Sequence, residues 1–156
     1  MAKLVADLRE YKRGYKKNYE SYKTLYNNNA HSRARKMLLA YSDECGLKYL
    51  VLKQWQIINY RDIADLVNNK DNPRNTIIKT HNLEMLMKEL GQAGMFRFPT
   101  KLKSSRGEAV NTENFHQFCR YEIYAADGLH SEESAFEDVL RNIADWIGER
   151  MCEEGV

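Results

Sequence analysis

Residues 37–53 read MLLAYSDECGLKYLVLK, and when the segment is drawn as a helix its apolar side chains occupy nearly all of the circumference. A helix that is hydrophobic on every side belongs in the centre of a domain. The pattern extends from His31 to Trp55, and Ser32 is a suitable N-cap residue at its start. Gly46, which costs a helix about 1 kcal/mol relative to alanine, indicates that another helix approaches closely there. The sequence therefore predicts one long, buried, central helix.

The preceding segment has the pattern of an amphipathic helix. Leucines and tyrosines recur at steps of three and four between Leu4 and Tyr26, with lysines and arginines between them. This spacing predicts a helix of about 25 residues that ends near residues 27–29 and packs its tyrosines on the core. As an alternative, five tyrosines interleaved with cations also suit stacking on nucleic-acid bases.

The remaining segments continue the helical pattern. Helices are expected over 56–69, over 83–90 with His81-Asn82 as its cap and Gly91 as its end, from Asn111 or Thr112 to about 126, and from a cap at Ser131 onward. The β-branched run at 76–78 is ambiguous. Together these segments predict a single all-α domain over residues 1–156, an antiparallel helical bundle of about five helices.

Composition excludes several classes of protein. No apolar run approaches the roughly 20 residues that a membrane span needs, and the N-terminus lacks the apolar core of a secretory signal. Three well-separated cysteines and four scattered histidines match neither a disulfide framework nor a metal site, and no phosphate-binding or dinucleotide-binding glycine motif occurs. The sequence thus predicts a soluble, cytoplasmic protein without a metal or cofactor.

Charge is distributed unevenly along the chain. Formal charges are +7 over residues 1–53, +4 over 54–106 and −9 over 107–156. Such a partition indicates either a phosphate-binding face or helices of opposite charge that attract one another. The long loop expected at about 91–110 carries four cations beside aromatic residues: Arg97, Lys101, Lys103 and Arg106. This composition suits RNA binding, although surface loops are commonly rich in cations.

The order of these segments resembles the HEPN domain, an all-α bundle found in bacterial defence, toxin–antitoxin and nucleotide-related proteins. The resemblance covers residues 31–147 and is carried by LLAYSDECGLKYLVLK, THNLEMLMKELG, FCRYEIYA and SEESAFEDVLRNIADWI. It implies one of two functions. Catalytic members are homodimeric, metal-independent endoribonucleases with an Arg-x4–6-His motif. Other members lack this motif and bind a nucleotide or a partner protein, for example a nucleotidyltransferase encoded beside them. The resemblance thus implies RNA or a nucleotide as the ligand, and an antitoxin or a nucleotidyltransferase as a protein partner.

Two pairs of residues are candidates for the motif. Arg74, followed by a polar Asn75, has six residues between it and His81, and the two share a face only if one helix continues through both. Glu44 and Lys48 fit a Glu-x3-Lys pattern that often accompanies the motif in the family.

The second candidate pair, His116 and Arg120, has the reverse order. In either pair, a neutral imidazole can accept the proton of an RNA 2′-hydroxyl while the guanidinium stabilises charge on the phosphate. The hypotheses are therefore an endoribonuclease, a binding module for a nucleotide or protein, and an α-helical structural protein.

Overall fold

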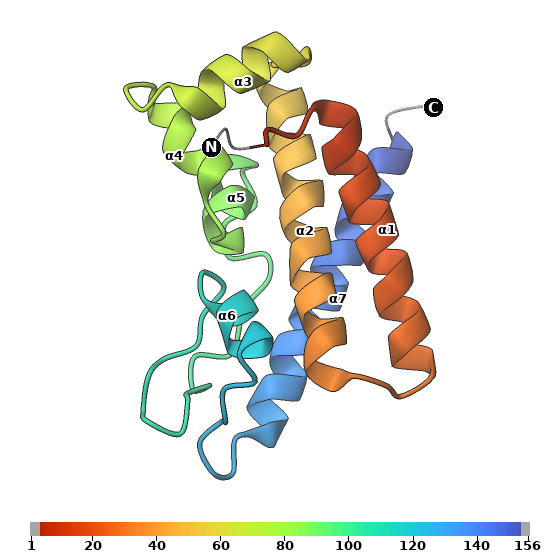
Figure 1. Cartoon of the computed structure of the whole chain (residues 1–156), viewed down its shortest axis with the longest axis vertical. Helices are drawn as coiled ribbons and strands as arrows, with labels where there is room; N and C mark the ends of the chain where they lie inside the picture. Colours follow the sequence, from red (N-terminus) through yellow and green to blue (C-terminus); the bar gives the residue numbers. More distant parts are fainter. Residues whose placement is uncertain (1–3, 154–156) are drawn as a thin grey trace.

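The computed structural model describes residues 4–153, and every regular element in this part of the chain is a helix (Figure 1). The seven helices within these residues are α1 (Leu8–Asn27), α2 (Ser32–Trp55), α3 (Tyr60–Asn68), α4 (Pro73–Lys79), α5 (Leu83–Glu89), α6 (Phe115–Arg120) and α7 (His130–Glu153). The all-α helical bundle expected from the sequence is confirmed. None of the helices described is long and apolar enough to cross a membrane.

The three long helices α1, α2 and α7 form the body of the bundle (Figure 1). Helix α1 runs antiparallel to α7, because Tyr15 donates to the carbonyl of Ala144 at 2.6 Å whereas Tyr22, further along α1, reaches Glu137 at 2.8 Å, nearer the start of α7. Helices α2 and α7 run parallel instead, since the intervening helices carry the chain from the end of α2 back to its beginning. The expected antiparallel arrangement therefore does not extend to this pair.

In α1 and α2, residues that the sequence pattern predicted to face the core are buried there. Tyr15 and Tyr22 are buried, and α1 ends at Asn27, so the tyrosine stripe packs on the core. Gly46 lies where α1 and α7 both meet α2: a β-carbon there would lie 2.7 Å from Ile147 and 2.9 Å from Tyr15. The close helix approach inferred from this glycine is confirmed.

Several predicted helix ends are wrong because local hydrogen bonds compete with the helix. Ser32 is the first helical residue rather than the cap, which is His31 in the left-handed conformation, φ 47°. Asn111 binds the backbone N–H groups of Glu113 and Asn114, so the helix expected from 111 or 112 to 126 shortens to α6.

The other boundaries shift for similar reasons. Asn59 caps α3, so the helix expected from residue 56 begins at Tyr60. The ambiguous run at 76–78 is helical within α4, and the last helix already begins at His130. The helix at 83–90 agrees with α5, which Asn82 caps and which Gly91 follows at a positive φ of 75°.

Ion pairs between basic residues of α2 and acidic residues of α7 join these two helices. Glu133 on α7 accepts from Arg33 at 3.0 Å and from Lys36, and Glu137 accepts from Arg35 at 3.0 Å. Lys36, Glu133 and Glu137 are buried. The attraction between helices of opposite charge is thus confirmed for these two helices, and these cations are not available to a phosphate.

Candidate functional site

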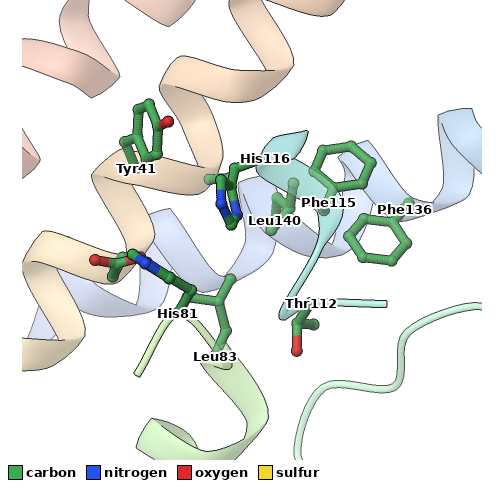
Figure 2. A pocket seen from close by; sticks show the side chains of 10 residues that line it. Tyr41, His81, Leu83, Thr112, Phe115, His116, Phe136 and Leu140 are labelled. Atoms are coloured by element: carbon green, nitrogen blue, oxygen red, sulfur yellow. The ribbon is translucent and has the colours of Figure 1, made fainter. Parts of the chain in front are cut away.

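Two histidines from different segments meet beside the middle of α2 (Figure 2). His81 lies just before α5 and His116 lies on α6, and their ring centroids are 4.8 Å apart with planes inclined by 46°. Asn82 accepts from the backbone N–H of Glu84 at 3.0 Å and from the hydroxyl of Thr112 at 2.9 Å. Asn82, which caps α5, is therefore also bonded to the segment before α6. This hydrogen bond helps to fix the position of His81 relative to His116.

Glu44 on α2 orients His81. Its Oε1 lies 2.8 Å from Nδ1 of His81, and its Oε2 accepts from the buried Lys48 at 3.0 Å. Because an ionised carboxylate only accepts hydrogen bonds, Nδ1 of His81 carries the hydrogen. The other ring nitrogen, Nε2, is left for a ligand, and the His81 side chain is 53% exposed.

Arg120 completes the polar part of the site. Its guanidinium donates to the hydroxyl of Tyr41 on α2. The hydrogen bond to Tyr41 raises the pKa of Arg120. The ring of Tyr41 also lies 6.2 Å from that of His116, so a permanent cation is fixed next to the histidines.

The surroundings of His116 favour its neutral form. Burial lowers its pKa, and the nearby charges of His81 and Arg120 lower it further, against an opposing effect of Glu44. A neutral imidazole is able to act as a general base near pH 7. The two histidines therefore have different environments: one donates to a carboxylate, and the other is held without charge.

The cavity beneath the histidines is small and largely apolar. Phe115 and Phe136 stack at 4.3 Å between centroids, and with Leu83 and Leu140 they line the cavity (Figure 2). Its volume is only about 10 Å³, far too little for a nucleobase. A ligand of the histidines must lie at the mouth of this cavity, on the protein surface.

Arg74 is absent from this cluster. Helix α4 ends at Lys79 and Thr80 is extended, so no continuous helix connects Arg74 to His81. The guanidinium of Arg74 instead lies 4.7 Å from the ring centroid of Trp55. Trp55 is three turns further along α2 than Glu44, about 16 Å at the helical rise, so the structure does not bring Arg74 to the Glu44–His81 contact.

The other candidate residues from the sequence come together. Glu44, Lys48 and His81 are linked by hydrogen bonds, and His116 and Arg120 join them from α6. The two candidate pairs are thus parts of one site, without Arg74. Sequence reasoning missed Tyr41, although it is three residues from Glu44 and therefore shares its helix face.

The basic loop expected at about 91–110 is free of helix, and its four cations are exposed: Arg97, Lys101, Lys103 and Arg106. Arg106 is paired with Glu108 at 2.9 Å. The loop is fixed against the segment after α6, since Ser105 N–H donates to the carbonyl of Tyr124 at 2.7 Å and Ala126 N–H to that of Lys103 at 2.9 Å. Its cations therefore have defined positions relative to the site.

Within residues 4–153, no group of three or more histidine, cysteine, aspartate or glutamate side chains is arranged to hold a metal ion. No protein-family model, curated protein or solved structure matches this chain.

Proposed function

We propose that the chain is a metal-independent endoribonuclease, the activity that its resemblance to the HEPN domain implies. The observation that supports this best is the His81–His116 pair, 4.8 Å between ring centroids, with Glu44 bonded to one ring and burial favouring the neutral form of the other. Two imidazoles in different environments are what a paired general base and general acid require. The exposed mouth of the site suits a phosphodiester on a long strand better than an enclosed nucleotide.

The residues have distinct roles in the proposed reaction. Neutral His116 removes the proton of a 2′-hydroxyl, whose oxygen attacks the adjacent phosphorus. The bond from phosphorus to the 5′-oxygen breaks, and His81, acting as an imidazolium whose positive charge Glu44 compensates, gives that oxygen the proton of its Nε2 and becomes neutral. Arg120 stabilises the negative charge that develops on the phosphoryl oxygens. The products are a 2′,3′-cyclic phosphate and a 5′-hydroxyl.

The biological setting follows from the resemblance alone. Members of the family act as homodimers in bacterial defence or toxin–antitoxin systems, and some have an antitoxin or nucleotidyltransferase partner. We propose the same setting for this chain. Sedimentation velocity tests the homodimer directly: a dimer has about twice the 18.3 kDa of one chain, whereas a single species at the mass of one chain contradicts it.

The test is cleavage of total RNA by purified protein in EDTA. We expect cleavage by the wild type and a loss of 10²-fold or more in the single variants His81→Ala and His116→Ala, as is typical when a general acid or base is removed. His31→Ala and His130→Ala remove exposed histidines outside the cluster and serve as matched controls. Mapping of 2′,3′-cyclic phosphate ends identifies the reaction.

Two outcomes contradict the proposal. Full activity of the double variant His81→Ala/His116→Ala assigns the cleavage to a contaminant or to other residues. Saturable binding of a nucleotide or of RNA without cleavage, in the wild type and all variants, identifies the chain as the binding module that is the alternative function of such domains.

A further inference from the structure

Two tyrosines directly after the candidate site are among the most exposed large side chains described. Tyr121 is 63% exposed and Tyr124 is 81% exposed. Most of the other tyrosines of the described chain pack on the core, above all those of α1. Both rings lie largely outside the core, and we refer to Tyr121 and Tyr124 together as the tyrosine platform.

The backbone under the tyrosine platform is held rigidly. Arg33 on α2 donates to the carbonyls of Phe118 and Ile123, at 3.0 and 2.8 Å, and its own charge is paired with Glu133. Glu122, between the two tyrosines, adopts a positive φ of 49°, which is uncommon for a residue with a side chain. Hydrogen bonds to Arg33 thus fix a turn in which Ile123 packs on the core while Tyr121, Glu122 and Tyr124 are exposed.

The tyrosine platform is continuous with the candidate site and with the basic loop. Tyr121 directly follows Arg120, the last residue of α6, and the Tyr124 backbone accepts from the loop at Ser105. Lys103, whose carbonyl accepts from the same segment, is exposed and forms no ion pair within residues 4–153. Arg120 thus directly precedes the two tyrosines, and the backbone of Lys103 is bonded to the segment that follows them, with Glu122 as the acidic residue between the tyrosines.

We propose that the tyrosine platform binds an unpaired RNA strand next to the cleaved bond. Bases stack on Tyr121 and Tyr124 while the adjoining phosphates contact Arg120 and Lys103. Stacking on aromatic side chains needs bases whose faces are free, so a duplex cannot bind in this way. The inference rests on the proposed ribonuclease function, to which it adds the part of the substrate that is recognised.

The test measures binding separately from cleavage. The probe is a fluorescein-labelled RNA of twelve mixed-sequence nucleotides with 2′-O-methyl groups, which lacks the attacking hydroxyl, and its duplex with a complementary strand. Anisotropy titrations compare the wild type with Tyr121→Ala/Tyr124→Ala, with Tyr121→Phe/Tyr124→Phe and with Tyr60→Ala. Tyr60 is 54% exposed on α3 and provides the matched control.

We expect the double variant Tyr121→Ala/Tyr124→Ala, called the alanine pair, to bind the single strand at least tenfold more weakly, since each stacked base contributes to the binding free energy. The phenylalanine pair keeps the rings and retains most of the affinity, and Tyr60→Ala has no effect. Unchanged binding by the alanine pair, equal binding of the duplex, or no binding of the single strand by the wild type overturns the inference.

The two proposals fail separately. If the enzyme cleaves RNA but the alanine pair binds and cleaves as the wild type does, the tyrosine platform is wrong and the ribonuclease stands. If Tyr121→Ala/Tyr124→Ala loses single-strand binding but the wild type does not cleave natural RNA, the tyrosine platform stands and the ribonuclease is wrong.

Discussion

Asp43 is a fully buried acidic residue whose carboxylate oxygens have no hydrogen-bond partner among the residues described. It is adjacent in sequence to Glu44 but lies on the inner side of α2, near Tyr15 of α1 and Asp145 of α7. Burial, and secondarily the charge of Asp145, raises its pKa well above the ordinary value. In the folded protein the neutral form is therefore favoured.

This residue makes the free energy of unfolding depend on pH. The pKa of Asp43 is higher in the folded than in the unfolded chain, so its contribution is complete below the unfolded pKa and is lost as the pH rises through the folded value. We expect Asp43→Asn to become progressively more stable than the wild type from about pH 4 upward, with a slope of up to about 1.4 kcal/mol per pH unit. Urea unfolding between pH 4.5 and 8 measures this difference, with the exposed Asp65→Asn as control. Parallel profiles for wild type and Asp43→Asn contradict it.

Alanine substitutions of the two candidate arginines should have different effects on RNA cleavage. Arg120 lies beside the histidines, whereas Arg74 contacts Trp55. We expect Arg120→Ala to reduce RNA cleavage about 10²-fold, as for other groups that stabilise a charged transition state. Arg74→Ala removes only a cation–π contact and leaves the cleavage rate unchanged. Initial rates on one oligoribonucleotide distinguish them, and a defect in Arg74→Ala comparable to that in Arg120→Ala refutes the assignment.

At the scale of helices, α2 and α7 are joined by buried ion pairs as well as by apolar packing. Glu133 is the centre of these pairs, accepting from Lys36 and from two nitrogens of Arg33. Burial by itself raises the pKa of Glu133, but the hydrogen bond and charge of Lys36, together with Arg33, outweigh it, and the net effect lowers this pKa. The carboxylate is thus ionised wherever the protein is folded near neutral pH.

Removing this carboxylate should be costly. Glu133→Ala leaves the buried Lys36 without its acidic partner, and we expect a loss of about 3–5 kcal/mol in the free energy of unfolding. Glu108→Ala breaks an ion pair on the surface, with Arg106, and should cost much less because solvent screens exposed charges. Urea unfolding at pH 7 compares the two variants. Equal effects would mean that the buried network contributes no more than a surface pair.

A second prediction at this scale concerns Gly46. Alanine has the better helix propensity by about 1 kcal/mol, yet its β-carbon would lie within 3 Å of Ile147 and Tyr15. We expect Gly46→Ala to destabilise the protein by about 1–3 kcal/mol, since overpacking exceeds the gain in propensity. Thermal and urea unfolding test this, and a stabilised variant would show that the helices separate easily.

At the scale of the whole molecule, the candidate site joins three parts of the chain on one side of α2. Glu44 and Tyr41 come from α2, His81 from the start of α5, and His116 and Arg120 from α6. The basic N-terminal third contributes little to this side, because cations of α2 are paired with α7. A bound RNA therefore meets only a few free cations near the site.

The salt dependence of RNA binding tests this distribution of charge. Each phosphate contact to a single strand contributes about −0.7 to the slope of log K against log salt. With Arg120, Lys103 and one neighbouring loop cation, we expect a slope of about −2 for the 2′-O-methyl strand. A slope steeper than about −5 would require the lysines of α1 to bind phosphates and would place the strand on a different face.

Patterns of short range determined the helices of this protein. The tyrosine stripe of α1, the apolar circumference of α2, the glycine at a helix crossing and the Asn82 cap of α5 all depend on neighbours within about one or two turns, and each agrees with the structure. The predicted starts of α2 and α6 were wrong: His31 caps α2 in the left-handed conformation, and Asn111 forms a local turn where the first turn of the second helix was expected.

Only the tertiary structure decided the composition of the site. The spacing of Arg74 and His81 suggested a pair, but the break after Lys79 separates them, whereas His116, 35 residues from His81 in sequence, packs against its ring. That contact depends on how α5 and α6 pack on α2 and on the bond from Thr112 to Asn82. Such contacts result from the burial of apolar side chains distant in sequence, which has no period along the chain, and so no local pattern could predict them.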